Sequence, residues 1–385
     1  MTDAGTYPTG PTGAYPAVPY VPAYGTASLA DLPESMLSSL GLPGSNVLGL
    51  EPAARVCLFL VDGLGAELLA AHADAAPFLT GQTARTISAG FPSSTPTSLA
   101  TLGTGIPPGE HGMVGIHMAV PGEGRLLDCL RWTAPGLPVD PDVWQPAETV
   151  YQRLSAHGAD PVYVAPAAFD GTGLTRAVYR GMRYWPADTV DERVDGVRQA
   201  LADSSFVTVY YGDLDLAGHL AGWGSDRWLE QLAVVDQMAE RIAGGLPPGS
   251  ALYVTADHGM INVVDKVDVD NRPDLQEGVT MLGGDARARH VYTEPGAAEA
   301  VRETWSEALH GRAWVVTREE AADAGWFGRR VRKEWLGRIG DVMAVAYGGC
   351  AIVASRTEPL ESALVGYHGS LTRAEQSVPL LEVRR

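Results

Sequence analysis

The sequence predicts an α/β fold in which a mostly parallel central sheet carries helices on both faces and a smaller α/β lobe is inserted. Two observations favour this fold. Short apolar runs alternate with helical patterns along the chain, an alternation typical of parallel sheets covered by helices on both faces. In addition, acidic residues follow directly or shortly after three of these runs. At 385 residues the chain is long enough for one large domain with insertions.

The predicted strands are short and apolar on both faces, which is typical of buried strands in a parallel sheet. They are residues 56–61, 162–164, 206–211 and 251–256. Residues 289–292 and 313–316 are predicted as two further strands, which flank the helix at 297–309 in the smaller lobe. Two later runs, 341–346 and 350–354, are predicted to form a hairpin around Gly348-Gly349. Helices are predicted at 28–40, 66–73, 225–243 and 297–309, where apolar residues recur at helical spacing.

Composition divides the chain into a tail and one domain. Residues 1–27 are rich in Pro, Tyr, Gly, Thr and Ala without helix or strand periodicity, and such a segment cannot bury enough apolar surface to fold. We therefore predict a disordered tail at 1–27 and one folded domain at 28–385. A more polar, less regular stretch around 262–335 is predicted to be the inserted lobe.

Charge limits the partners that the protein can bind. Lys and Arg number 28 and Asp and Glu 46, so that the formal net charge is −18. This surface disfavours nucleic acid polymers, which require clustered cations, but it admits a small phosphorylated substrate whose charge is met locally by metal. Protein partners are left open.

The cysteines and the hydropathy pattern predict a cytoplasmic protein. Cys57, Cys129 and Cys350 are odd in number and form no CxxC pair, which favours a reducing compartment. No run approaches the roughly 18 apolar residues of a membrane span, and the beginning of the sequence has no basic region followed by an apolar one. We expect neither a membrane segment nor a signal peptide.

The stretch 91–112 has the pattern of a reactive hydroxyl group at the start of a helix. Thr95 precedes Pro96, and threonine is a good N-cap residue while proline suits the first helical position. Gly103 and Gly105 can end this helix. The Thr95 hydroxyl would lie in the positive field of the helix N-terminus, although a plain N-cap without chemistry is an equally simple interpretation.

Carboxylates and imidazoles recur at or near strand ends and late in the chain. The candidates are Asp62, Asp215, His219, Asp257, His258 and His368. Asp215 and His219 are four residues apart and would share one face of a helical turn, whereas the rival Asp213 lacks this spacing. Such a mixture of nitrogen and carboxylate ligands favours zinc, with manganese as the alternative. Six side chains divide into two sets of three, and two metals about 4 Å apart can clamp a phosphoryl transfer.

Taken together, these motifs resemble the alkaline phosphatase superfamily, and most of all its nucleotide pyrophosphatase/phosphodiesterase (type I phosphodiesterase) branch. The resemblance covers roughly residues 55–370. Its motifs are residues 61–65, 91–95, 104–112, 215–219, 255–260 and 367–369. Each alone is weak, since Asp-Gly turns and Asp-His pairs are common, but their order is specific. The resemblance implies an alkaline-phosphatase-like fold.

The resemblance also implies a mechanism, in which a threonine attacks phosphorus and water hydrolyses the resulting phospho-enzyme. It assigns the metal ligands as two sets: Asp62, Thr95, Asp257 and His258 for one zinc ion, and Asp215, His219 and His368 for the other. The distance to the motifs at 104–105 and 111–112 selects Thr95 over Ser93 and Ser94 as the nucleophile. His111 would be structural.

Two departures from the family pattern leave the substrate open. Pro96-Thr97-Ser98 replaces an aromatic-Pro-Asn sequence, and Gly115-Ile116-His117 replaces a segment that supplies a phosphate-binding asparagine; His117 is a candidate substitute or a surface residue. We expect a hydrolase of phosphodiester or pyrophosphate bonds, with nucleotides among its candidate substrates.

The alternatives are a phosphomonoester or phosphonate hydrolase and a noncatalytic binding protein that retains the fold. Arg287 and Arg289, in the predicted lobe, are expected either to set leaving-group preference or to be solvated surface charges.

Overall fold

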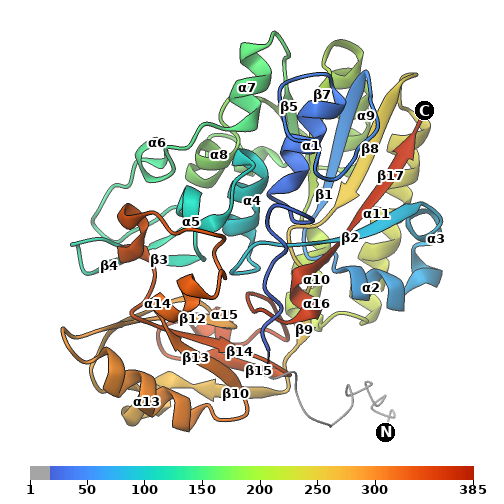
Figure 1. Ribbon diagram of the computed structural model, residues 1–385. Coiled ribbons are helices and arrows are strands. Elements are labelled where there is room, and N and C mark those ends of the chain that lie inside the picture. Colours follow the sequence, from blue (N-terminus) through green and yellow to red (C-terminus); the bar gives the residue numbers. More distant parts are fainter. Residues whose placement is uncertain (1–17) are drawn as a thin grey trace, which may run out of the picture.

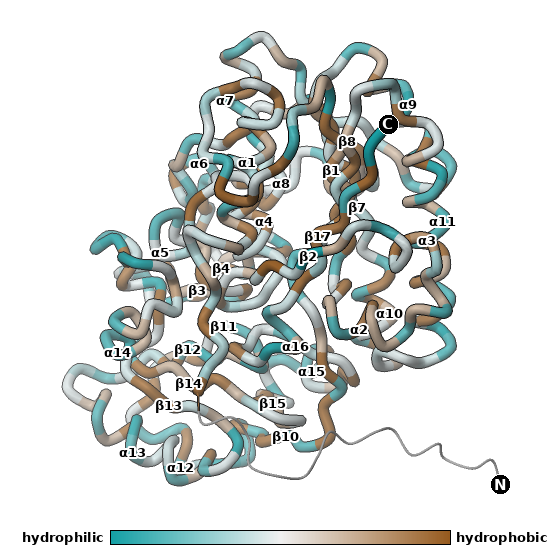
Figure 2. Tube along the Cα trace, turned by 45° about the vertical axis from the view of Figure 1, so that its right-hand side comes forward, coloured by the Kyte–Doolittle hydropathy of each residue, from teal (hydrophilic) through white to brown (hydrophobic). Residues whose placement is uncertain are grey.

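The computed structural model describes residues 18–385 and is organised around a mixed central sheet (Figure 1). Within those residues this sheet has seven strands in the order β2-β17-β8-β1-β7-β5-β6. Their bounds are β1 Arg55–Val61, β2 Thr83–Ser88, β5 Val162–Ala165, β6 Arg183–Pro186, β7 Phe206–Tyr211, β8 Ser250–Thr255 and β17 Ser377–Arg384. The central strands, β1 and β8 among them, are largely hydrophobic in Figure 2, and β1, β5, β7 and β8 are buried along nearly their whole length, as expected for strands covered on both faces.

The centre of the sheet is parallel. β1 pairs in parallel with β7 and with β8, and β5 pairs in parallel with β6 and β7. Only β17 runs against its neighbours, β2 and β8. The predicted α/β class with a mostly parallel sheet is therefore confirmed.

Helices cover both faces of the sheet (Figure 1). The longer ones are α1 Asp31–Ser39, α4 Thr95–Thr104, α7 Val150–Ala156, α9 Val190–Asp203, α10 Asp213–Ala221, α11 Asp226–Gly244 and α13 Ala298–Ala308. The shorter ones are α2 Ala66–Ala71, α3 Pro77–Thr80, α5 Pro108–His111, α6 Pro141–Trp144, α8 Gly173–Val178, α12 Pro273–Gln276, α14 Arg318–Asp323, α15 Pro359–Ser362 and α16 Arg373–Gln376. Helices α9 and α11 pack together on one face, and α1, α4, α7 and α8 on the other.

A second sheet is antiparallel and lies beside the first (Figure 1). Its order is β13-β14-β12-β11-β3-β4. Its strands are β3 His117–Val120, β4 Arg125–Asp128, β11 Val279–Asp285, β12 Ala288–Thr293, β13 Ala313–Thr317 and β14 Val342–Ala346. Strands β3, β4 and β14 of this sheet lie outside the lobe that was predicted at 262–335. The sequence did not predict this, because long-range pairings such as Gly284 with His117 leave no local sequence signal.

The hairpin predicted around Gly348-Gly349 is wrong. β14 pairs with β12 and β13 in the antiparallel sheet. The next strand, β15 (Cys350–Val353), pairs in parallel with β10 (Asp265–Asp268) instead. Gly348 has a φ of 55°, which lets the chain turn, but the two strands enter different sheets. A short pair, β9 (Ile261–Asn262) with β16 (Gly366–Tyr367), connects this region to the main domain.

Part of the predicted tail is docked on the domain. Residues 1–17 of that tail lie outside the described residues, whereas residues 18–27 follow the domain surface. The Tyr24 hydroxyl donates to the carbonyl of Trp326 at 3.1 Å and accepts from the Phe91 amide at 3.0 Å. The composition of the segment did not predict these contacts, because its binding partners belong to the domain and lie far away in the sequence.

The three cysteines are buried and unpaired. Within residues 18–385 no helix has both the length and the apolar character needed to cross a membrane.

Candidate metal centre

The predicted site residues gather at the carboxyl edge of the central sheet. Asp62 follows β1, Asp257 and His258 come after β8, and α10 begins just beyond β7. Because these three strands are parallel neighbours, their ends meet at one edge, where open α/β sheets place their sites. The structure thereby brings together residues that lie far apart in the chain, from Asp62 to His258.

One group of candidate ligands consists of Asp62, Asp257 and His258, which offer ligand atoms that all lie within 4.8 Å of one another. His258 Nε2 lies 3.4 Å from Asp62 Oδ1 and 3.4 Å from Asp257 Oδ2. All three side chains are buried. These are the arrangement and the donor types of a divalent cation site.

A second group consists of Asp215, His258 and His368, again within 4.8 Å. His219 lies beside it, since its Nε2 is 3.2 Å from Asp215 Oδ2 and 3.2 Å from His368 Nε2. The rings of His258 and His368 stack with centroids 3.5 Å apart. His258 therefore lies between the two groups, whereas the family resemblance assigns it to the first metal only.

The three imidazoles are oriented by backbone carbonyl groups. The Nδ1 contacts are His219 to Gly366 O at 2.8 Å, His258 to Gly259 O at 3.0 Å and His368 to Ser93 O at 2.8 Å. A carbonyl oxygen can only accept a hydrogen bond, so each Nδ1 donates and each Nε2 carries no hydrogen in the neutral ring. Carbonyl contacts of this kind are what orients metal-binding histidines.

The carboxylates each leave an oxygen atom for a ligand. Asp257 Oδ1 accepts from the amides of Gly63 and His258 at 3.1 and 3.0 Å, and Asp62 Oδ2 accepts from the Tyr210 hydroxyl. Asp62 Oδ1, Asp215 Oδ1 and Asp257 Oδ2 are buried without a hydrogen-bond partner. Such buried, unpaired oxygens are costly, and a divalent cation would satisfy them.

The carboxyl groups and histidines perturb one another strongly. Burial, together with the charges of Asp257 and Asp215, raises the pKa of Asp62. Burial alone would raise the pKa of Asp215, but the charge and hydrogen bond of His219 lower it, and Asp215 in turn raises the pKa of His219 against the effect of burial. Bound cations would replace this repulsion among carboxylates with attraction.

Thr95 is the first residue of α4 and lies at the edge of this cluster. Its Oγ1 is 3.4 Å from His258 Nε2 and it is only partly buried. The N-cap of the helix is Ser94, with extended angles φ −135° and ψ 151°, so the expectation that Thr95 itself is the N-cap is wrong by one residue. Gly105 ends the helix with φ 70°, as predicted.

The rival hydroxyls are enclosed. Ser93 Oγ donates to the Ser370 carbonyl at 2.9 Å, and Ser94 Oγ lies 3.2 Å from Thr97 Oγ1; both serines are fully buried. His111 is also internal, accepting from the Met113 amide at Nδ1 and contacting Thr101 at Nε2. It therefore packs inside the domain, as expected of a structural histidine.

Other candidates lie elsewhere. Asp213 is exposed at the start of α10. His117 Nε2 is 3.9 Å from Asp128 Oδ2, so this side chain contacts the neighbouring strand β4. Arg287 and Arg289 are neither solvated nor free to contact substrate, because both are buried in ion pairs, with Glu375 and Glu358 respectively. Both expectations for these arginines are corrected.

Sequence reasoning missed Tyr210, whose hydroxyl holds one oxygen of Asp62. The available signal was its place near the end of β7, the strand paired with the one that precedes Asp62. It also missed the carbonyl groups that orient the imidazoles, since backbone positions in a loop leave no residue-type signal.

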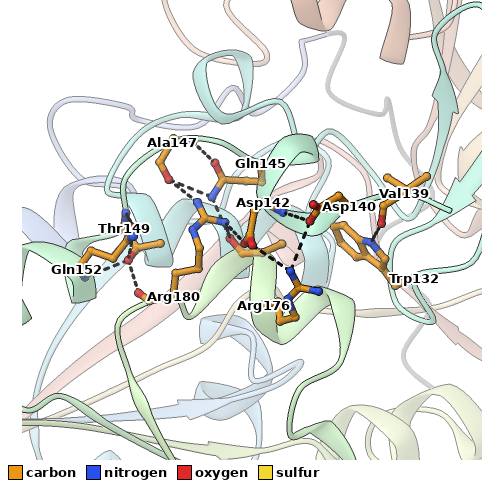
Figure 3. Close-up of polar contacts among 11 residues, drawn as sticks. Trp132, Val139, Asp140, Asp142, Gln145, Ala147, Thr149, Gln152, Arg176 and Arg180 are labelled. Carbon is orange, nitrogen blue, oxygen red and sulfur yellow. Dashed lines mark hydrogen bonds and ion pairs between the residues drawn. The ribbon is translucent and has the colours of Figure 1, made fainter.

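A separate cavity of about 290 Å³ lies between α8 and β6. Aromatic side chains and two arginines line it, including Tyr163, Tyr179, Tyr184, Arg176 and Arg180. In Figure 3 both arginines reach toward Asp142, and Arg176 Nη2 lies 2.9 Å from its Oδ2. The cavity contains none of the seven predicted site residues.

Comparison with known proteins agrees with this geometry. The family model "Type I phosphodiesterase / nucleotide pyrophosphatase" matches residues 56–371. No curated protein matches the chain. Murine ectonucleotide pyrophosphatase/phosphodiesterase 5 superposes with a TM-score of 0.67 at 18% identity, covering 85% of this chain and 87% of that one.

Two further solved structures are similar. An inactive threonine-to-alanine variant of the same murine protein, in complex with AMP, has a TM-score of 0.67 at 17% identity over 85% of this chain and 87% of that one. Phosphonoacetate hydrolase from Sinorhizobium meliloti 1021, in complex with phosphonoacetate, has a TM-score of 0.65 at 18% identity over 86% and 90%.

These likenesses show the alkaline-phosphatase-like fold, and the family model extends over most of the chain. The two candidate cation groups at the sheet edge are consistent with a bimetallic hydrolase of that family. The chain belongs to the type I phosphodiesterase/nucleotide pyrophosphatase family of hydrolases, within the alkaline phosphatase superfamily.

Proposed function

We propose that the protein hydrolyses the phosphodiester or pyrophosphate bond of a small phosphorylated substrate, with Thr95 as the nucleophile. The observation that carries this proposal is the position of Thr95 Oγ1, 3.4 Å from His258 Nε2 at the edge of the cluster of buried carboxylates and imidazoles. Ser93 and Ser94, the neighbouring hydroxyls, are fully buried and so are poorly placed to meet a substrate.

The proposed ligands are those that the family resemblance implies. Asp62, Thr95, Asp257 and His258 would hold one ion, and Asp215, His219 and His368 the other, with zinc favoured and manganese as the alternative. Divalent ions in these places would supply Lewis-acid charge to offset the negative charge of the phosphate. The central position of His258 leaves room for it to serve either group.

The side chains and backbone of the protein supply the nucleophile and hold the site in place. The positive end of α4 favours an anionic oxygen on Thr95, which attacks phosphorus while the alcohol or phosphate leaving group departs. Water then cleaves the phosphothreonine and regenerates the hydroxyl. The carbonyl contacts of the three imidazoles and the Tyr210 hydroxyl keep the site in one geometry. Groups that are held in place before the substrate binds lower the activation barrier, because they need no rearrangement during the reaction.

Nucleotides are the first candidate substrates. The murine relative that binds AMP was captured as an inactive threonine-to-alanine variant, which supports both a nucleotide substrate and a threonine nucleophile here. The phosphonoacetate hydrolase, of equally similar fold, supports a phosphonate or phosphomonoester hydrolase as the second candidate. Turnover of bis-p-nitrophenyl phosphate against p-nitrophenyl phosphate distinguishes the two.

The test of the nucleophile is Thr95→Ala together with Thr95→Ser. The alanine variant should fold and retain most of its metal, but it should lose turnover by about a thousandfold or more, whereas the serine variant keeps a hydroxyl group and some activity. Acid quenching of the wild-type reaction and mass spectrometry should locate a phosphoryl group on Thr95. Phosphorylation of Ser93 or Ser94, or an active alanine variant, would overturn the assignment.

The metal requirement is tested separately by elemental analysis. We expect two divalent ions per chain, and His368→Ala should lose one of them together with hydrolysis. Full activity after exhaustive chelation would exclude the two-metal proposal. The cytoplasmic location stays a prediction, which cell fractionation would test.

A further inference from the structure

Ser93 joins the segment before the proposed nucleophile to the segment that carries His368. Its amide donates to the Gly369 carbonyl at 3.2 Å, and its own carbonyl accepts from His368 Nδ1 at 2.8 Å. Its hydroxyl donates to the Ser370 carbonyl at 2.9 Å and accepts from the Gly369 amide at 3.2 Å. The amide, the carbonyl and the hydroxyl of one residue therefore all bond to three consecutive residues, 368–370.

The contact is buried on both sides. Ser93 and Ser370 are fully buried, and Gly369 is buried as well. Gly369 has a φ of 129°, a conformation that favours glycine, and in it both of its backbone groups bond to Ser93. A buried amide that loses its acceptor is costly. Removal of the Ser93 hydroxyl should therefore displace the segment 368–370.

Both of the joined segments belong to the candidate metal centre. Ser93 lies two residues before Thr95, the first residue of α4. On the other side of the contact, the His368 ring stacks on the His258 ring with centroids 3.5 Å apart. His258 Nε2 in turn lies 3.4 Å from Thr95 Oγ1. A displacement of 368–370 would therefore move a proposed ligand relative to the rest of the centre.

We propose that Ser93 is a positioning residue, whose hydroxyl fixes the place of His368 and thereby sets the affinity of the second metal site. This rests on the proposed function, because it takes Asp215, His219 and His368 as the ligands of that site. The Ser93 carbonyl orients the imidazole itself, whereas the hydroxyl holds the two residues that follow it in the chain. Hydrogen-bond partners just outside the ligands commonly set the affinity for a metal ion.

The experiment is a double-mutant cycle in which the affinity for Zn²⁺ is measured by competition with a chelating dye. It compares the wild type, Ser93→Ala, His368→Ala and the variant that combines both substitutions. The matched control is Ser94→Ala, which removes the same atom from the neighbouring and equally buried residue. The Ser94 hydroxyl contacts Thr97 Oγ1 of its own helix at 3.2 Å, so its loss leaves the bonds of Ser93 in place.

We expect Ser93→Ala to bind one of the two zinc ions about tenfold more weakly, at the lower end of the range for such outer partners, because the Ser93 carbonyl still orients His368. His368→Ala should lose that ion, and the added Ser93→Ala should not weaken the ion that remains. Ser94→Ala should keep both affinities, as should Ser93→Thr, which retains the hydroxyl. In the zinc-loaded wild type the Ser93 and Gly369 amide hydrogens should exchange slowly, since each donates across the buried contact.

Unchanged zinc affinities in Ser93→Ala, an equal loss in Ser94→Ala or Ser93→Thr, or a weaker remaining ion in the combined variant would overturn the positioning role and leave the proposed hydrolase intact. Rapid exchange of the Ser93 or Gly369 amide in the wild type would overturn it too, even if Ser93→Ala does not fold. A wild type that binds no zinc would instead refute the proposed metal centre and this inference with it. Two bound ions without turnover of any phosphate ester would refute the proposed function alone.

Discussion

Replacing Arg287 with methionine should destabilise the protein strongly. Arg287 follows β11 and pairs with Glu375 on α16, and both side chains are fully buried. Its Nε donates to Glu375 Oε1 at 3.1 Å, its Nη2 to Oε2 at 2.6 Å and its Nη1 to the Gly348 carbonyl at 3.0 Å. The pair thus ties the second sheet to the segment that follows His368.

The magnitude follows from the burial of the partner. Methionine keeps much of the length of arginine but leaves the Glu375 carboxylate buried without its cation, and breaking such a pair costs about 3–5 kcal/mol. Glu375 retains the Ser370 amide at 3.0 Å, which favours the lower end of that range. Adding Glu375→Gln to Arg287→Met removes the stranded charge and should recover part of the loss.

The assay is equilibrium unfolding in urea of the wild type, the single and double variants, and Arg302→Met as control. Arg302 pairs with Glu299 on the surface, where solvent screens the charges, so a much smaller loss is expected. A loss for Arg287→Met no larger than that of the control would refute the reasoning. Altered relative rates across substrates with unchanged stability would restore the specificity role predicted for this arginine.

Three further outcomes are expected. Tyr210→Phe removes a hydrogen bond to Asp62 and should weaken metal binding roughly 10–100-fold, as measured by competition with a chelating dye; equal affinity would count against the bond. Burial raises the pKa of Asp285 to about 7, so the folded state keeps a proton that the unfolded chain loses near its usual pKa of about 3.9, and the contribution of Asp285 to stability should fall as pH rises between these values. Asp285→Asn has no carboxyl group at this position and should lack that loss. The difference in melting temperature between the wild type and Asp285→Asn should therefore change between about pH 4 and pH 7. A difference that stays constant over this range would exclude the raised pKa of Asp285. Truncation through Gly25 removes docked contacts of Ala23 and Tyr24 and should lower the melting temperature more than truncation through Ala17, which leaves these contacts in place.

Local patterns in the sequence determined the elements and the chemistry near their ends. The apolar run before Asp62 is a strand because it is buried on both faces, and the four-residue spacing of Asp215 and His219 places both on one side of α10. Both signals span only a few residues, within the reach of backbone periodicity. The order of the motifs along the chain identified the family, because each motif follows a particular strand or helix.

Tertiary structure alone decided which groups meet. The position of His258 between the two ligand groups, the hydroxyl of Tyr210 on Asp62 and the pairing of β15 with β10 rather than β14 all depend on segments far apart in the chain. The same holds for Arg287, whose sequence neighbourhood suggested a surface charge but whose partner lies 88 residues away. Such contacts are selected by the packing of the whole domain, in which a buried charge or strand edge must find its partner, and no local periodicity encodes that choice.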